Sequence, residues 1–368
     1  MKRCRRGVPP GGGAFDGVAM SINRLLSVAV AAVLAVGILG HHAYREAQAP
    51  FKGFSGDEIF VPVATGETSR AIAQSLQGNG VIKDAGLFLV LLKLRGKAGH
   101  LQAGEYRFTE AESLLEVMDR LVAGDVFYRS VTIPEGLTLW ETADLLSQRG
   151  IGDGEALRAA FRRGALVASL DPRAGDLEGY LFPETYRFVR NPTPDEVADA
   201  LVNRFVSVFD EARRARAREL GLEVRDVVTL ASVVEKETGR DDERPLIASV
   251  FWNRLRRRMP LQSDPTIIYD LKRRGVFDGN IRRRDLKLDS PYNTYRQAGL
   301  PPGPIASPGT DAIDAVLHPA ESDFLYFVSR NDGSHHFSGS LPEHNAAVRR
   351  FQIDHARKRR PAGPEQRS

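Results

Sequence analysis

An uncharged apolar run near the N-terminus constrains this chain more than any other feature. From Leu25 to Gly40 it reads LLSVAVAAVLAVGILG. A membrane-spanning helix usually needs about 20 predominantly apolar residues, so we predict a spanning helix over residues 25–44, which includes the residues just after the run. A cleavable signal peptide, cut near Ala47–Ala49, is one alternative, and a core helix of a soluble protein is another.

The charges beside this run predict its orientation. Five basic residues precede it and Asp16 is the one acidic residue there; the basic ones are Lys2, Arg3, Arg5, Arg6 and Arg24. The positive-inside rule then puts residues 1–24 in the cytoplasm. We therefore predict a single-pass protein of a bacterial inner membrane, with everything after about residue 45 in the periplasm.

Overall charge and cysteine content exclude several classes of protein. The 51 basic residues are nearly balanced by 47 acidic ones, which leaves a net charge of +4, so no nucleic-acid partner is predicted. The one cysteine, Cys4, excludes an intrachain disulfide and a cysteine-based metal site. Residues 356–368 form a basic, polar tail that we predict to be disordered.

Two stretches of the first half resemble each other at an offset of 70 positions. The first, over 60–82, reads FVPVATGETSRAIAQSLQGNGVI, and the second, over 130–151, reads SVTIPEGLTLWETADLLSQRGI. Each predicts a short strand, a glycine turn, a threonine N-cap and an amphipathic helix ended by glycine. Between them, residues 103–108 and 113–121 predict another strand and helix.

Repeated strand–helix units of this size are similar to LysM-type modules, which bind glycans containing N-acetylglucosamine. A generic structural role for the repeat is the alternative. Further along, the segment LEGYLFPETYRF over 177–188 is aromatic and broken by glycine and proline, so we predict an ordered loop that packs on the rest of the fold.

A helix over 227–255, VVTLASVVEKETGRDDERPLIASVFWNRL, carries the candidate catalytic group. Glu235 and Glu237 follow apolar residues on opposite sides of the helix. A carboxylate with apolar neighbours loses hydration, which raises its pKa toward the range a general acid needs. Arg240, three residues beyond Glu237, could neutralise that carboxylate, and this weakly favours Glu235 as the acid.

Polar and aromatic clusters follow this helix. LQSDPTIIY over 261–269 contains Gln262 and Asp264, which could hold a sugar, although Asp264 could instead cap the next helix. SPYNTY over 290–295 offers two rings, Tyr292 and Tyr295, and the amide of Asn293 for glycan binding. The proline-rich GLPPGPIASPG over 299–309 predicts a rigid cleft wall.

Other chemistries lack their usual residues in this sequence. His335, His336 and His344 come without an HExxH motif or clustered carboxylates, so we predict no metal site and no cofactor. The region after residue 45 also lacks a G-x-S-x-G motif, an SxxK motif and a Cys–His pair, which argues against acyl transfer.

The sequence resembles the YceG-like endolytic murein transglycosylases over roughly residues 45–355. The motifs that carry this resemblance are AGEYRF, EGYLFPETY, LASVVEKET, RLRRRMPLQSDPTIIY, SPYNTY, GLPPGPIASPG and FLYFVSRNDGSHHFSGSLPEHN. The resemblance implies a LysM-like region followed by a catalytic domain with a cleft. It places the catalytic glutamate on Glu235 and the glycan contacts on Gln262, Tyr292, Asn293 and Tyr295.

These observations together predict an α+β protein with five segments. They are a basic N-terminus (1–24), a transmembrane helix (25–44), a LysM-like wall-binding region (45–151), a mixed α/β catalytic domain (152–355) and the tail (356–368). The resemblance implies endolytic cleavage of nascent peptidoglycan strands with formation of 1,6-anhydro-N-acetylmuramic acid, and a peptidoglycan synthase as a further partner. A hydrolytic muramidase using Glu235 with Asp264, and a non-catalytic wall-binding scaffold, remain as rivals.

Overall fold

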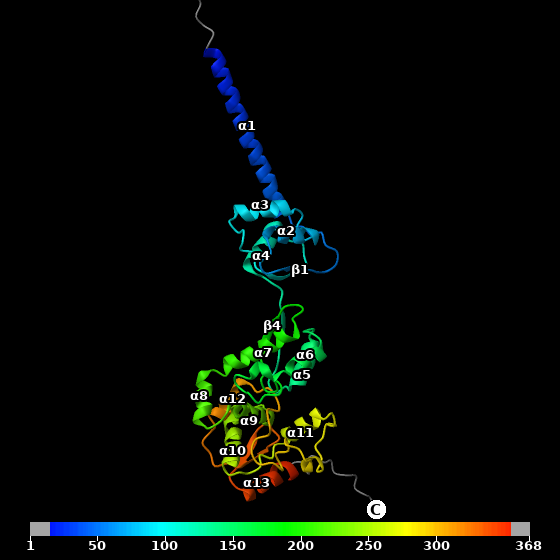
Figure 1. Cartoon of the computed structure of the whole chain (residues 1–368), viewed down its shortest axis with the longest axis vertical. Helices are drawn as coiled ribbons and strands as arrows, with labels where there is room; N and C mark the ends of the chain where they lie inside the picture. Colours follow the sequence, from blue (N-terminus) through cyan, green and yellow to red (C-terminus); the bar gives the residue numbers. More distant parts are fainter. Residues whose placement is uncertain (1–14, 355–368) are drawn as a thin grey trace, which may run out of the picture. The chain divides into compact units, whose positions relative to one another are not determined.

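The computed structural model describes residues 15–354, with side chains from residue 26 onward. It divides into two compact units, with the boundary between Phe127 and Tyr128 (Figure 1). Sequence analysis placed this boundary after residue 151, so the second copy of the repeat belongs to the C-terminal unit rather than to the N-terminal one. The predicted basic N-terminus lies mostly, and the predicted tail entirely, outside the described residues.

The N-terminal unit begins with helix α1 (Phe15–Gln48). Its stretch Leu26–Gln48 is 23 residues long and contains an 18-residue window with a mean hydropathy of 1.9, none of which is buried in the protein. At about 1.5 Å per residue this stretch extends roughly 35 Å, enough to cross a hydrocarbon core of about 30 Å. Length and composition therefore fit a single-pass membrane anchor.

A two-stranded antiparallel ladder and three helices complete this unit. Strand β1 (Ile59–Val63) pairs with β2 (Gly104–Phe108), with Ile59 opposite Phe108. Helices α2 (Ser69–Gly78), α3 (Ala85–Leu94) and α4 (Leu114–Ala123) pack around the buried face of the ladder. Alternate strand residues such as Val61 and Tyr106 are buried, as the period-2 pattern of a one-sided sheet requires.

The structure confirms the predicted local structure of both repeat copies. Thr68 and Thr138 are the N-caps of α2 and α5 (Leu139–Gln148), and their side chains accept backbone N–H groups of the first turn. Gly66 and Gly136 adopt φ values of +79° and +76°, which side chains rarely allow. The copies differ in their partners, because β3 (Arg129–Thr132) of the second copy pairs with β4 (Thr185–Phe188).

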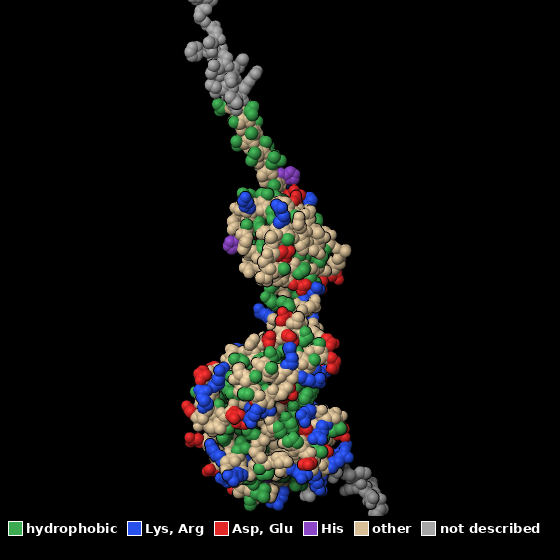
Figure 2. Space-filling model, in the orientation of Figure 1, with side chains coloured by type: hydrophobic (Ala, Val, Ile, Leu, Met, Phe, Trp, Pro, Cys, Tyr) green, Lys and Arg blue, Asp and Glu red, His purple; other side chains and the backbone are tan. Residues whose placement is uncertain are grey.

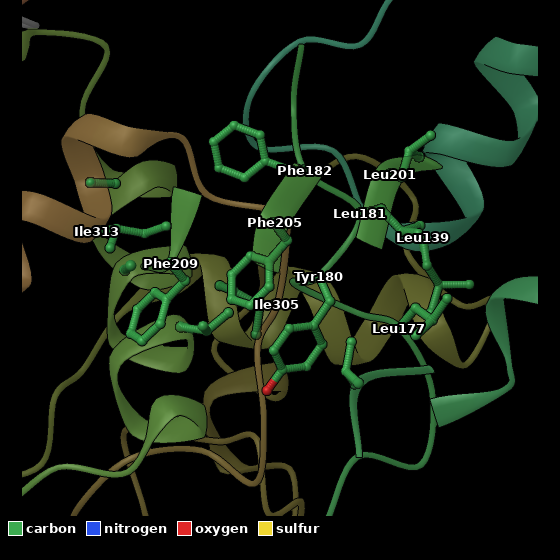
Figure 3. Packing of buried hydrophobic residues seen from close by; sticks show 14 of the residues in the cluster. Leu139, Leu177, Tyr180, Leu181, Phe182, Leu201, Phe205, Phe209, Ile305 and Ile313 are labelled. Carbon is green, nitrogen blue, oxygen red and sulfur yellow. The ribbon is translucent and has the colours of Figure 1, made fainter. Parts of the chain in front are cut away.

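Strand β4 also corrects the prediction for residues 177–188, whose last part is a strand rather than a loop. The first part of this segment packs on the core as expected, with Leu177, Tyr180 and Leu181 fully or almost fully buried. Figure 3 shows Tyr180 among Phe205, Phe209 and Ile305 in the C-terminal unit. The rings of Tyr180 and Phe205 meet edge to face at 5.1 Å.

The C-terminal unit is mainly helical and surrounds one central helix, α9 (Val224–Glu237). Besides α5, the other α-helices among the described residues of this unit are α6 (Gly154–Phe161), α7 (Pro194–Val208), α8 (Glu211–Glu219), α10 (Arg244–Arg256), α11 (Asp264–Arg273), α12 (Thr310–Leu317) and α13 (Leu341–Val348). One further ladder pairs β5 (Tyr326–Ser329) with β6 (His335–Ser338). Helices with separate antiparallel ladders agree with the predicted α+β class.

Helix α9 is central because its middle is buried on every side. All residues from Val227 to Val234 are buried, and α8, α10, α11 and α12 contact the helix. A helix that buries its whole circumference has no solvent face, so its charged residues lie near its two ends, and the polar Thr229 and Ser232 in its middle are buried. The last turn of α9 thus brings Glu235, Lys236 and Glu237 out of the core together.

Candidate functional site

The two glutamates at the end of α9 point in different directions. Residues two apart on an α-helix are separated by roughly 200° around its axis. Glu235 therefore lies on what we call the ion-pair side of this turn, and Glu237 lies on what we call the cavity side. The two sides have different neighbours.

On the ion-pair side, both carboxylate oxygens of Glu235 accept hydrogen bonds. Arg244 donates through Nη2 to Oε1 at 3.2 Å, and the backbone N–H of Gly309 donates to Oε2 at 3.1 Å. The Glu235 and Arg244 side chains are each only 6% exposed. Arg244 also contacts the partly exposed Glu135 from the second repeat copy at 3.4 Å, so this side is a charge network around a buried Arg244–Glu235 pair.

On the cavity side, Glu237 is partly buried and accepts a hydrogen bond from Ser263 Oγ to Oε1 at 2.6 Å. Burial raises the pKa of Glu237 to about 7, because the carboxylate loses hydration. The hydrogen bond from Ser263 lowers this pKa, the negative charge of Asp264 raises it further and Arg254 lowers it. Near neutral pH, Glu237 is therefore divided between its protonated and charged forms.

This pattern reverses the charge pairing expected from sequence. Arg240 was expected to neutralise Glu237, but its guanidinium pairs with Asp242 at 2.8 Å. The arginine that pairs with a glutamate of this turn is Arg244, which comes from the next helix and binds Glu235 instead. The expectation was wrong because the helix predicted over 227–255 is divided in the structure: α9 ends at Glu237 and α10 begins at Arg244. Helical spacing therefore no longer predicts the neighbours of residues beyond Glu237.

The cavity beside Glu237 has a volume of about 410 Å³. Three residues singled out by sequence line it: Gln262, Asp264 and Tyr295. Its remaining lining comes from Arg254 and Leu261, from Tyr326 and Phe327 of β5, and from Leu341, His344 and Asn345 at the start of α13. The cavity thus combines an acid, amide and hydroxyl groups, a second carboxylate and aromatic rings.

Two loops are joined at the cavity by hydrogen bonds through Thr294. The carbonyl of Thr294 accepts from the Gln262 N–H at 3.0 Å, and its hydroxyl accepts from the Ser263 N–H at 3.0 Å. Gln262 has a φ of +51°, which is uncommon for a residue with a side chain. Strain of this kind occurs where surrounding contacts hold the backbone in place, often at functional sites.

Asp264 begins helix α11 but does not cap it. The N-cap position belongs to Ser263, and no side chain makes a capping hydrogen bond there. The Asp264 carboxylate instead accepts a hydrogen bond from the Tyr295 hydroxyl at 2.6 Å. The alternative role suggested by sequence, a helix cap, is therefore not what the structure shows.

The other residues singled out by sequence lie outside the cavity lining. Asn293 is fully buried, and its amide nitrogen donates to the carbonyls of Leu286 and Leu288. Tyr292 is 9% exposed and its ring packs 5.1 Å from that of Tyr269. In the structure these two residues shape the loop that carries Tyr295, and Glu235 lies on the ion-pair side.

Sequence reasoning assigned no role to the residues that β5 and α13 contribute to the cavity. His344 stacks on Tyr326 with ring centroids 5.1 Å apart, and Arg254 lies over the same tyrosine ring at 5.0 Å. The pKa of His344 is lowered by burial and by the charge of Arg254. A weak sequence indication was present, since Leu341, His344 and Asn345 share one helical face at spacings of three and four.

Comparisons with known proteins show the family of this chain. A family model described as the YceG-like family matches residues 61–350. The endolytic murein transglycosylase of Bacillus subtilis (strain 168) is 32% identical over 318 residues, which cover 82% of this chain and 87% of that protein. The endolytic murein transglycosylase of Streptococcus pneumoniae (strain R6) is 30% identical over 356 residues, 87% of this chain and 63% of that protein.

A solved structure shows the same relationship. The crystal structure of a YceG-like protein from Listeria monocytogenes superposes with a TM-score of 0.54 at 31% sequence identity, covering 79% of this chain and 99% of that one. The match to the family model spans the ladder of the N-terminal unit, the end of α9, both loops of the cavity and α13. This chain belongs to the YceG-like family.

Proposed function

We propose that this protein is an endolytic murein transglycosylase that cleaves the bond between N-acetylmuramic acid and N-acetylglucosamine in nascent peptidoglycan strands. The observation that carries the proposal is Glu237, a carboxyl group with a pKa of about 7 in a cavity lined by polar and aromatic side chains. The two curated relatives described above bear the name of this activity. Cleavage of nascent strands would end their elongation.

The reaction needs one group that first gives and then takes a proton. Protonated Glu237 would donate its proton to the glycosidic oxygen as the bond to C1 of the muramic acid breaks. The resulting carboxylate would then take the proton from the C6 hydroxyl of the same sugar, whose oxygen attacks C1. The product is a 1,6-anhydro sugar, Glu237 ends protonated as it began, and no water is consumed.

The neighbours of Glu237 suit this cycle. Ser263 Oγ donates to Glu237 and stabilises the charged form that exists after the first proton transfer. Gln262 and Asn345 offer amide groups to hold the sugar, and Tyr295 offers a ring on which it can stack. Asp264, held by Tyr295, adds negative charge beside the developing oxocarbenium ion.

Glu235, which sequence analysis selected, is the competing candidate for the acid. Both its oxygens already accept hydrogen bonds, and it does not line the cavity. The ion-pair side therefore supports a structural role for Glu235, and the cavity side supports catalysis by Glu237. Digestion of purified peptidoglycan by Glu235→Gln and Glu237→Gln variants, followed by mass spectrometry of the products, tests this choice directly.

A hydrolytic muramidase is the second candidate function, because Asp264 supplies a second carboxylate in the same cavity. The same digestion separates the two reactions. Hydrolysis leaves products heavier by one water than the anhydro products of transglycosylation. A third candidate, a non-catalytic scaffold, requires that Glu237→Gln leaves cell-wall turnover unchanged.

We also propose that the N-terminal unit binds the cell wall, as its similarity to LysM-type modules suggests. Its strand–turn–helix copy, β1 with α2, supports this proposal. Deleting residues 60–125 should weaken sedimentation of the protein with insoluble peptidoglycan while some cleavage of soluble strands remains. Unchanged sedimentation would leave the unit with a structural role alone.

The proposed substrate requires the C-terminal unit to lie in the periplasm, and it makes a peptidoglycan synthase an expected partner. The basic residues before α1 support this orientation. A reporter that fluoresces only in the cytoplasm, fused after Ser368, should stay dark. Fluorescence there would contradict the proposed location and, with it, the proposed substrate.

A further inference from the structure

Helix α3 of the N-terminal unit is apolar on the side that faces away from its core. Its inner residues Ala85, Phe88 and Leu92 are buried in the core. On the outer face Val90 is 55% exposed and Leu94 is 76% exposed, and the two are four residues apart. A soluble domain usually has polar residues on the outward face of a surface helix. An apolar outward face therefore indicates a surface that contacts lipid or another protein.

The end of the membrane anchor lies beside this helix. Helix α1 contacts both α3 and α4, and Ala47, near the end of α1, is fully buried in the core of the unit. Glu46 forms an ion pair at 2.7 Å with Lys83, two residues before α3 begins. The anchor therefore continues into the folded unit without a linker (Figure 1).

Helix geometry places this junction at the membrane surface. The uncharged run ends at Gly40, and the segment from Gly40 to Ala47 rises roughly 10 Å along the helix axis. The headgroup layer beyond the hydrocarbon core is about 5–8 Å thick on each side. The core of the unit thus begins at the outer edge of the headgroup layer. Helix α3, which adjoins this junction, can therefore reach the headgroups.

The charges at the end of α3 fit the same surface. Lys93 and Lys97 are exposed at or just beyond the last turn of the helix, and Arg95, also exposed there, pairs with Asp119 at 3.3 Å. Basic side chains beside an apolar helical face are typical of helices that lie in a membrane interface, where anionic headgroups attract them. In Figure 2 the apolar side chains of α1 run down to the N-terminal unit, whose adjoining surface carries basic side chains.

We propose that α3 lies on the outer surface of the bilayer that α1 spans, with Val90 and Leu94 inserted among the lipids and the basic residues on the headgroups. The N-terminal unit is then held at two points, by the anchor and by α3. Two attachments fix the orientation of the unit relative to the membrane, which a single helix would leave free to rotate about its axis.

The test uses the full chain in lipid nanodiscs containing phosphatidylglycerol. Cys4→Ser removes the native thiol, and Leu94→Cys carries a polarity-sensitive fluorophore. Val276→Cys, at a residue that is 62% exposed in the C-terminal unit, is the matched control. We expect the label at position 94 to emit at shorter wavelength, to be quenched by lipids spin-labelled near the headgroup, and to be protected from aqueous iodide, whereas the label at 276 shows none of these effects.

A second variant shows whether the apolar face itself makes the contact. Lys93→Cys is labelled with and without the paired substitutions Val90→Glu and Leu94→Glu, both at exposed positions where the fold should tolerate them. We expect the paired substitutions to abolish lipid quenching of the label at 93 while circular dichroism stays unchanged. Quenching that survives them overturns the proposal.

Two further outcomes also overturn it. One is a label at position 94 that iodide reaches as readily as it reaches position 276. The other is a label that is shielded from iodide yet insensitive to the spin-labelled lipids. That result would mean that protein, such as a second copy of the chain, covers α3 instead of lipid.

Discussion

The ion-pair side and the cavity side of the last turn of α9 place two glutamates among different neighbours. Glu235 and Glu237 are the same residue type, two positions apart, on the same helix. One carboxylate pairs with Arg244 and accepts a hydrogen bond from a backbone N–H, and the other accepts one from a serine hydroxyl in a cavity that Arg254 also lines. The chemistry of a carboxyl group is therefore decided by its partners, not by its place in a motif.

The largest expected effect distinguishes the two sides directly. Glu237→Gln keeps the shape of the side chain but removes the acidic proton, so anhydro-product release should fall by about 10²–10⁴-fold. Glu235→Gln should remain measurably active, because its amide still fills the same space outside the cavity. Product release from purified peptidoglycan, with melting curves as the folding control, measures both. The reverse order of activities would move the acid to Glu235.

The pH dependence of the reaction sharpens the comparison. Only protonated Glu237 can act as the acid, so activity should decline above pH 7, by roughly 50-fold between pH 7 and pH 9. The Ser263 hydrogen bond lowers the pKa of Glu237. Ser263→Ala should therefore move the decline to higher pH, which rate measurements from pH 5 to pH 9 would detect. A decline unaffected by Ser263→Ala would show that another group limits the rate.

Titration of Glu237 should also make the stability of the folded protein depend on pH. Burial raises the folded-state pKa of Glu237 to about 7 from the ordinary value of 4.5 for a glutamate, so the folded protein binds this proton more tightly than the unfolded chain. That contribution to stability is fully present below about pH 4.5 and is lost as pH rises through 7.

Glu237→Gln does not titrate and should lose none of this stability. The free energy of unfolding of the variant, measured relative to that of the native protein, should therefore rise by about 2–3 kcal/mol from pH 4.5 to pH 8. Urea unfolding at several pH values checks it. A constant difference between the two proteins would mean that Glu237 is not protonated preferentially in the folded state.

The ion-pair side should show the smallest effect, and one on stability rather than on rate. Glu235→Gln leaves buried Arg244 with a weaker partner, although Asp241 and Glu135 still contact that arginine. We expect a loss of about 1–2 kcal/mol in the free energy of unfolding at pH 7, measured by urea unfolding. An unchanged stability together with a large loss of activity would indicate catalysis by Glu235.

The two repeat copies show the same dependence on tertiary partners. Both form the strand, turn and capped helix that their residues predict, because N-caps and glycine turns act locally. Yet β1 pairs within the N-terminal unit, and β3 pairs with a strand that sequence analysis took for part of a loop. In the second copy, the Gly136 carbonyl accepts a hydrogen bond from Lys236 of α9, so this copy supports the turn that carries both glutamates.

The sequence by itself determined the apolar anchor, the repeat elements, the central helix, the loops that carry Gln262, Asp264 and Tyr295, and the family. These follow from periodicity, local capping and long motifs, which need no knowledge of distant contacts. Tertiary structure alone decided which glutamate faces the cavity, that Asn293 is buried, and that β5 and α13 close the site. Helical spacing gives the angle between two side chains, but the environment at each angle depends on segments far away in the chain.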